Sequence, residues 1–186
     1  MTMLYTLFTI SCENPFHPNI QEYHSQASDF STPEMTLLNL EDAYNRKDVS
    51  LFKECLSENY MFQMLTSEID DIGIDFNEDG SNDDWWGYEQ EVSFHENLFQ
   101  NGSSDGSRKP PDNITLNLMI PDENFWQEDT QTGHEGWIII PCDFFLNLSF
   151  FESGATISSS GSATFFLEQD EDGKWLIAIW RDRSNI

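Results

Sequence analysis

Three oxygen-bearing side chains stand at alternate positions in one acidic stretch of the chain, Asp75-Phe-Asn77-Glu-Asp79-Gly80. Side chains spaced in this way can surround one cation, and the glycine permits the tight turn that brings them together. Calcium prefers such carboxylate and amide oxygens as ligands. The pattern therefore favours a calcium site, and the alternative is a solvated acidic loop with a turn at Asp79 and Gly80.

The second half of this segment departs from an EF-hand calcium loop. Its twelfth position, where a bidentate glutamate is expected, is Trp86, and its eighth position is Asn82 instead of an aliphatic residue. A calcium site would therefore need a further carboxylate from the residues around it. The carboxylates that could take that role are Asp70, Asp71, Asp83, Asp84 and Glu89.

The charge of the chain excludes a nucleic-acid-binding protein. Its 186 residues include 34 Asp and Glu against 8 Lys and Arg, which gives a formal net charge of -26. Affinity for a phosphate backbone comes chiefly from clustered basic residues. Hydrophobic residues make up 38% of the chain, too many for a disordered acidic protein, and the length suits one domain with or without a tail. No apolar run approaches the ~20 residues that a membrane-spanning helix needs.

The first residues of the sequence bear on where the protein is located. Residues 1–11 are apolar or hydroxylic and lead directly into Cys12, which resembles the end of a truncated bacterial lipoprotein signal peptide. Thr9, where an aliphatic residue is usual, and the absence of a basic residue before the apolar run depart from that pattern. The resemblance implies lipidation of Cys12, a flexible tether over residues 12–31, and a cell-envelope protein that meets the membrane only through its lipid. The alternative is a cytoplasmic protein.

Hydrophobic periodicity predicts three helices followed by a run of strands in residues 32–186. A first helix is expected after the cap Ser31 or Thr32, a second after Asp48, and a third ending near Phe99. An acidic loop at 66–84 interrupts this domain. The expected strands are 60–65, 114–120, 123–131, 136–151, 155–169 and 174–183. This order predicts an α+β domain in which a curved antiparallel sheet packs on the three helices.

Three segments, in their order along the chain, resemble the nuclear-transport-factor-2-like superfamily: AYNRKDVSLFKECLSENYMF, WGYEQEVSFHENLF and EDGKWLIAIWRD. The resemblance covers about residues 32–183 and implies a cone-shaped, cystatin-like α+β barrel. Members of the superfamily include ketosteroid isomerases, polyketide cyclases, dehydratases, transport adaptors and proteins that only bind something in the cone.

The resemblance argues against isomerase chemistry. Where those isomerases carry an oxyanion-stabilising tyrosine this chain has Leu40, and where they carry a general-base aspartate it has Met64. Neither side chain can donate or take up a proton. We therefore expect a lipid-anchored cone domain that binds a small molecule or a protein without catalysis and needs no cofactor.

The alternative is a cone enzyme of the polyketide-cyclase or dehydratase type, with acid–base chemistry at Tyr60, His95 and Asp182. In this fold the inner face of the sheet lines a mostly apolar pocket. Ordinary core packing would account for the same aromatic residues. The residues expected to line the pocket are Tyr44, Phe62, Trp86 and Trp180.

Two further expectations concern pairing. Cys55 falls in a predicted helix and Cys142 in a predicted strand. The two cysteines form either a disulfide or two buried free thiols. A homodimer would form through the outer face of the sheet, at an exposed strand that turns apolar side chains outward. The side chains expected there are Phe144, Leu146, Leu148 and Phe150.

Overall fold

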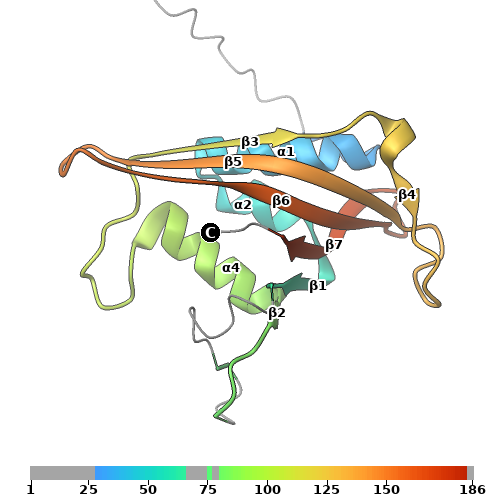
Figure 1. Cartoon of the computed structure of the whole chain (residues 1–186), viewed down its shortest axis with the longest axis horizontal. Helices are drawn as coiled ribbons and strands as arrows, with labels where there is room; N and C mark the ends of the chain where they lie inside the picture. Colours follow the sequence, from blue (N-terminus) through green and yellow to red (C-terminus); the bar gives the residue numbers. More distant parts are fainter. Residues whose placement is uncertain (1–27, 66–74, 77–79, 184–186) are drawn as a thin grey trace, which may run out of the picture.

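The computed structural model describes residues 28–65, 75–76 and 80–183 of the chain (Figure 1). The predictions for Cys12, for the tether up to residue 27, and for Asn77 and Asp79 lie outside these residues.

Two helices open the described chain, each begun by a side-chain cap. α1 spans Pro33–Arg46, and the Thr32 hydroxyl accepts a hydrogen bond from a backbone N–H of its first turn. α2 spans Val49–Glu54, and the Asp48 carboxylate accepts two such bonds. These caps satisfy N–H groups that have no partner inside the helix. Lys47, with a φ of 55°, makes the sharp turn between the two helices.

The third helix, α4, spans Tyr88–Glu96 and continues as a π-helical turn over Asn97–Asn101. Glu91, Val92 and His95 are buried on its inner face. The caps and the third helix therefore lie where the sequence predicts them.

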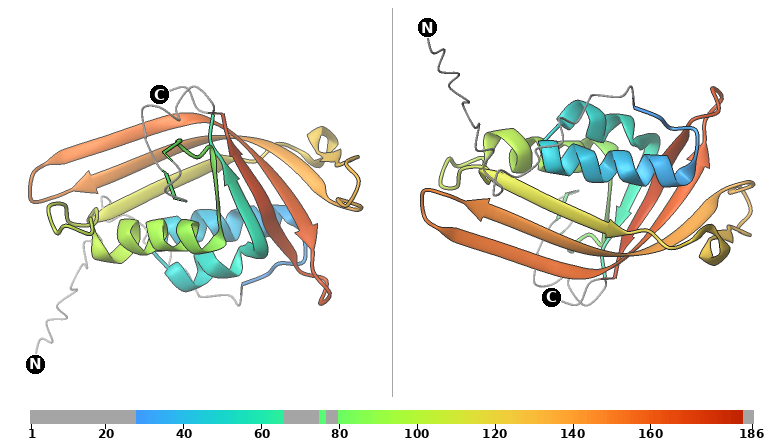
Figure 2. Two further views of the ribbon diagram at one scale, coloured as in Figure 1. Left: turned by 90° about the horizontal axis from the view of Figure 1, so that it is seen from below. Right: turned by 90° about the horizontal axis from the view of Figure 1, so that it is seen from above.

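One curved sheet of seven strands packs on these helices within the described residues. The strand order is β2-β1-β7-β6-β5-β3, and β4 pairs with β5 outside this path. Figure 2 shows the sheet curling around the helices, with the β5–β6 hairpin projecting beyond them. The strands are β1 (Leu56–Gln63), β2 (Trp85–Gly87), β3 (Asn113–Met119), β4 (Gln127–Glu128), β5 (Ile138–Phe150), β6 (Ala155–Gln169) and β7 (Trp175–Asp182).

The sheet is mixed, which corrects the prediction of a wholly antiparallel one. β1 and β7 run parallel, and the other pairs are antiparallel. These two strands lie at opposite ends of the domain sequence, so no hairpin turn forces them to be antiparallel. The strand expected at 123–131 is also reduced, because Glu123–Phe125 forms a 3-10 turn and only β4 is extended.

The core lies between the inner face of the sheet and the three helices. Leu37, Leu40 and Phe52 from the helices meet Phe165 and Ile177 from the sheet, and all five are fully buried. Burial of this apolar surface is the main stabilising contribution to such a layered fold.

Cys55 and Cys142 are buried free thiols and form no disulfide. Burial raises the pKa of Cys142 to about 12 and also raises that of Cys55. Both thiols therefore stay protonated at neutral pH and behave as small apolar core residues.

The apolar residues that were expected on the outer face of β5 point the other way. Ile140 and Cys142 are buried, and alternation along the strand carries the same inward direction on to Phe144, Leu146 and Leu148, which pack against the core. The outward series instead includes Phe145, which is 41% exposed.

Candidate functional site

The inner face of α4 buries two titratable side chains inside the cone. Glu91 and His95 lie one helical turn apart and are only 3% and 6% exposed. Residues four apart share a helix face, and Val92 beside them is also buried, so the helix carries both polar groups inward with its apolar stripe.

Hydrogen bonding fixes the tautomer of His95. Its Nδ1 lies 2.9 Å from the backbone carbonyl oxygen of Glu91, which can only accept, so Nδ1 carries the hydrogen. Its Nε2 therefore holds the lone pair and accepts a hydrogen bond from the Tyr44 hydroxyl at 2.5 Å. Burial lowers the pKa of His95 to about 4. The imidazole is consequently neutral near pH 7, and its approach to the Glu91 carboxyl, 3.6 Å from Nδ1 to Oε1, is not an ion pair.

The Glu91 carboxyl meets Trp86 and Tyr60. One of its oxygens accepts a hydrogen bond from the indole N–H of Trp86. Burial raises the pKa of Glu91 to about 7, and the polar groups of Trp86 and Tyr60 offset part of that rise. The Tyr60 hydroxyl is buried and makes no well-formed hydrogen bond within the described part of the chain. Burial first, and then the charge of Glu91, raise the pKa of both Tyr60 and Tyr44 well above the usual tyrosine range.

Glu91 and His95 thus form a carboxyl that is protonated below about pH 7 beside an imidazole that is neutral above about pH 4. Their environments push the two pKa values in opposite directions, which is the arrangement that acid–base enzymes use to assign roles to a pair. Glu91 can hold a proton near neutral pH. The lone pair on His95 Nε2 can accept a proton only when the Tyr44 hydroxyl no longer donates its hydrogen bond to that atom.

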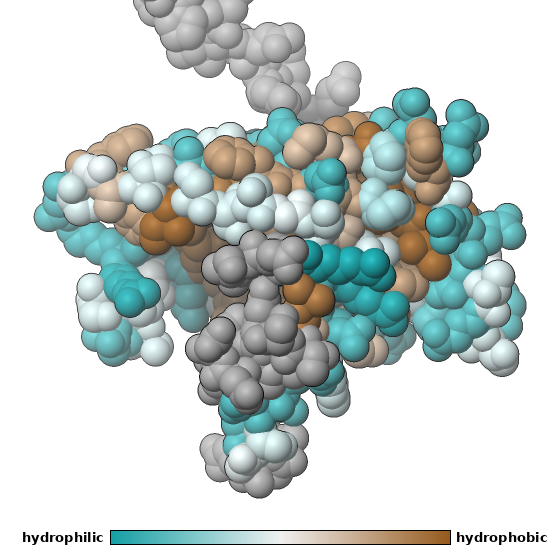
Figure 3. Space-filling view, viewed as in Figure 1, coloured by the Kyte–Doolittle hydropathy of each residue, from teal (hydrophilic) through white to brown (hydrophobic). Residues whose placement is uncertain are grey.

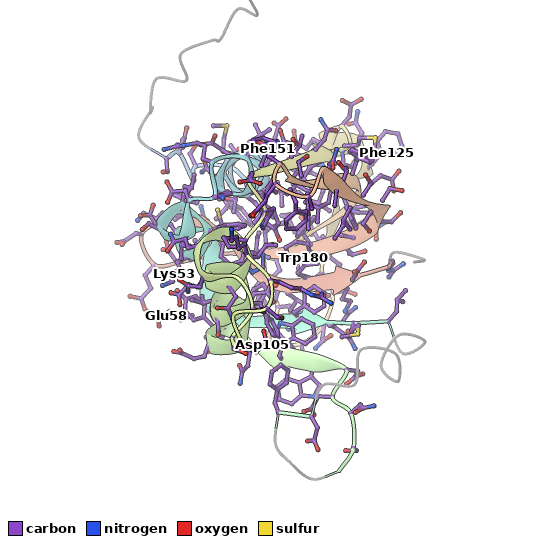
Figure 4. All side chains as sticks on the ribbon, turned by 90° about the vertical axis from the view of Figure 1, so that its left-hand side faces the viewer. Lys53, Glu58, Asp105, Phe125, Phe151 and Trp180 are labelled. Carbon is purple, nitrogen blue, oxygen red and sulfur yellow. The ribbon has the colours of Figure 1, made fainter. Side chains whose placement is uncertain are left out.

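A wall of aromatic rings continues from this cluster across the sheet. Phe62 stacks on Trp86 with ring centroids 4.3 Å apart, and Trp180 contacts Phe62 at 5.8 Å and Phe165 at 5.0 Å. Figure 4 shows Trp180 near the middle of the molecule. The Trp180 indole N–H is buried and has no hydrogen-bond partner among the described residues.

The structure brings most of the predicted site residues to this interior. Tyr60 and His95 both lie against Glu91, and Asp182, at the end of β7, is close enough to Tyr44 for its charge to raise the pKa of that hydroxyl. Of the predicted pocket residues, Phe62, Trp86 and Trp180 share the aromatic wall, and Tyr44 binds His95.

Glu91 is the member of the cluster that the sequence interpretation missed. A glutamate on a helix is usually solvated, so the composition gave no reason to select it. Its signal was positional: Glu91 stands four residues before His95, on the same helix face.

A groove on the surface of the described residues lies at the end of α4 and not in this interior. A groove of about 860 Å³ runs between the segment 102–112 and the projecting β5–β6 hairpin. Figure 3 shows apolar residues gathered under that hairpin. We call it the hairpin groove. Its lining comprises Asn97, Leu98, Gly102, Ser103, Ser107, Arg108, Lys109, Pro110, Pro111, Asp112, Leu148, Phe150, Glu152, Ser153 and Ile157.

The wall formed by residues 102–112 is fixed by short contacts. Gly102 has a φ of 77°, and a Cβ at this position would lie 2.1 Å from the carbonyl oxygen of Arg108. The Arg108 carbonyl accepts a hydrogen bond from the Ser103 N–H at 2.9 Å, and the Pro111 carbonyl accepts one from Lys47 Nζ at 2.7 Å. Only glycine fits this close approach.

Comparison with known proteins shows the fold. No family model matches this chain, and no curated protein matches it. A conserved protein from Planctomyces limnophilus aligns over 80% of this chain and 89% of its own, with a TM-score of 0.55 and 11% identity. A nuclear transport factor 2-like superfamily protein from Salmonella enterica aligns over 81% and 87%, with a TM-score of 0.51 and 12% identity. The chain has the nuclear-transport-factor-2-like fold.

Other proteins with the nuclear-transport-factor-2-like fold differ in their named chemistry. A ketosteroid isomerase-like protein from Erwinia carotovora atroseptica aligns over 86% of this chain and 100% of its own, with a TM-score of 0.50 and 12% identity. At such identities the likeness concerns the fold alone. In the present cone, Leu40 and Met64 are buried apolar side chains.

Among the described residues, no three His, Cys, Asp or Glu side chains are placed to hold a metal ion. The Asp75 carboxylate accepts a hydrogen bond from the Gly80 N–H at 2.9 Å, while Asn77 and Asp79 lie outside the described residues. No helix in the described ranges is long and apolar enough to cross a membrane.

Proposed function

We propose that this chain is a non-catalytic binding domain and that its ligand is a small, uncharged, mostly apolar molecule held in the hairpin groove. The observation that carries the proposal is the groove itself. Its volume of about 860 Å³ falls in the range of ligand pockets, roughly 300–1,000 Å³. Most of the surface that lines it is apolar, although polar and charged side chains also border it, and a mostly apolar lining also matches such pockets. The apolar lining residues are Leu98, Pro110, Pro111, Leu148, Phe150 and Ile157.

The charges around the groove favour a neutral ligand. Arg108 and Lys109 are balanced by Asp112 and Glu152, and Lys109 Nζ lies 2.6 Å from the Glu152 carboxylate. The net charge of -26 repels anions from the molecule as a whole. An apolar, uncharged ligand is not repelled by the net negative charge and needs no unpaired charged side chain in the groove.

Binding of Nile red, a neutral apolar dye, tests this proposal. Ile157 lines the groove and is 56% exposed, so Ile157→Glu should fold and place a charge in the apolar floor. We expect this substitution to weaken dye binding about tenfold, or ~1.4 kcal/mol. Met119→Glu is the matched control, because Met119 is 55% exposed on β3 and does not line the groove. Equal losses in the two variants would contradict the proposal.

A second candidate is a cone enzyme, favoured by the opposite pKa shifts of Glu91 and His95. The test is deuterium exchange at the carbon next to the carbonyl of β-hydroxy ketones, followed by NMR in heavy water. An enzyme of the cyclase or dehydratase type would catalyse this exchange and lose it on Glu91→Gln. Exchange that survives in that variant would remove Glu91 from the mechanism.

Lipid anchoring through Cys12, with a place in the cell envelope, also remains our proposal from the sequence. Its support is the apolar run that leads into the cysteine. An intact mass of protein from its native cells tests it: a chain that begins at an acylated Cys12 supports the anchor, and an unmodified Met1 rules it out.

A further inference from the structure

The outer face of α4, opposite the buried cluster, borders a second and smaller concavity. Its volume is about 220 Å³, and we call it the outer hollow. Phe76 reaches it from the segment that precedes β2. The residues that line it are Phe76, Glu89, Gln90, Ser93 and Phe94.

Two aromatic rings stand at the surface of the outer hollow. Phe76 and Phe94 are 36% and 37% exposed, and their ring centroids lie 6.0 Å apart with the planes inclined at 51°. Large aromatic side chains are usually buried, so two neighbouring exposed rings beside a concavity indicate a binding surface.

A third ring, that of Trp86, packs against both Phe76 and Phe94. Trp86 is buried and meets Phe94 edge-on at 5.4 Å and Phe76 at 6.0 Å. Trp86 is itself fixed on its other side, because it stacks on Phe62 and its indole N–H donates to Glu91. The rings of the outer hollow are therefore positioned before any ligand arrives, which reduces the entropic cost of binding.

The charge at the outer hollow is negative. Glu89 contributes a carboxylate to the lining, and no Lys or Arg is among the described residues that line it. Lys53 pairs with Glu96 at 2.7 Å, and this hydrogen bond chiefly, with a smaller contribution from the charge of Glu89, raises the pKa of Lys53. Ring faces carry negative electrostatic potential, so aromatic rings and a carboxylate together attract a cation.

We propose that the outer hollow binds a small organic cation, an ammonium group bearing alkyl substituents, over the ring faces of Phe76 and Phe94 and beside the carboxylate of Glu89. Alkyl groups on the ammonium contact the rings, and the positive charge meets the carboxylate. This site lies apart from the hairpin groove and does not depend on the function proposed for it.

Choline and its uncharged isostere 3,3-dimethyl-1-butanol are the probes that test the proposal. Each is titrated into the full chain at constant ionic strength, and binding is followed by NMR. We expect saturable choline binding that is at least about fivefold tighter than binding of the alcohol, because only choline carries the charge. Choline that does not saturate, or an alcohol that binds equally well, would overturn the proposal.

Matched substitutions locate the site. We expect Phe94→Leu and Glu89→Gln each to weaken choline binding about three- to tenfold. Phe125→Leu and Glu58→Gln change an exposed phenylalanine and an exposed glutamate away from the hollow and should leave binding unchanged. Figure 4 labels both control positions. Equal losses in all four variants would mean diffuse attraction to an acidic molecule only, which contradicts a built site.

Discussion

Burial decides where one proton sits inside the cone. Between pH 4.5 and 6.5, the ordinary pKa values of the two groups, the unfolded chain has an ionised Glu91 and a protonated His95. In the fold the pKa of Glu91 rises to about 7 and that of His95 falls to about 4, so Glu91 holds the proton and His95 is neutral. Both states bind one proton to this pair. The pair therefore adds little pH dependence to stability in this window.

Removing one partner should expose the pH dependence of the other. In Glu91→Gln only His95 remains, and its lowered pKa gives stability that is present above pH 6.5 and lost as the pH falls toward 4. In His95→Gln only Glu91 remains, and its raised pKa gives stability that is present below pH 4.5 and lost as the pH rises toward 7. Each slope can approach about 1.4 kcal/mol per pH unit.

Urea unfolding of both variants and of the unchanged protein between pH 4.5 and 6.5 measures these slopes. Subtracting the curve of the unchanged protein cancels the other titrating groups that all three share. We expect slopes of opposite sign for the two variants. Slopes of the same sign would contradict the neutral pair.

Sequence reasoning identified individual residues of the interior better than their contacts. Tyr60 and His95 were selected as candidates that share a pocket, and the structure places both against Glu91. The contact itself depends on how β1 packs on α4, and spacing along the chain contains no information about that. Glu91 was not selected because charged residues on a helix are usually exposed to solvent, whereas this one is buried.

At the scale of elements, the sequence predicted correctly those features that depend only on residues close together in the chain. Thr32 and Asp48 cap α1 and α2 as the sequence predicts, because a cap depends only on the first turn that follows it. The start of β1 at Leu56, four residues before the expected Tyr60, and its parallel pairing with β7 were not predicted. Both depend on partners more than a hundred residues away.

The segment after α4 offers a prediction at the same scale. In Gly102→Ala the new methyl group would meet the Arg108 carbonyl oxygen, and the positive φ of 77° adds strain. We expect a loss of ~1–3 kcal/mol in the free energy of unfolding and weaker dye binding in the hairpin groove. Gly106→Ala has a similar φ of 70° but meets no atom within 4 Å, so it isolates the cost of strain alone. Thermal unfolding compares the two, and equal destabilisation would contradict the close approach.

At the scale of the whole molecule, α4 separates three environments. Its inner face carries the pair Glu91 and His95, and its outer face borders the outer hollow. The π-helical turn that continues it borders the hairpin groove through Leu98. The fold class and the cone were predicted from the sequence and confirmed by the structural comparisons. The groove was not, because it forms where a projecting hairpin meets a distant segment.

The most direct test of the central claim is methyl NMR of the full chain during titration with Nile red. Leu98, Leu148 and Ile157 line the hairpin groove, whereas Leu40 and Ile177 lie in the buried core. The account predicts saturable shifts and ligand contacts at the three groove methyl-bearing residues, with the two core residues unchanged. Contacts at the core residues and none at Leu148 or Ile157 would contradict it.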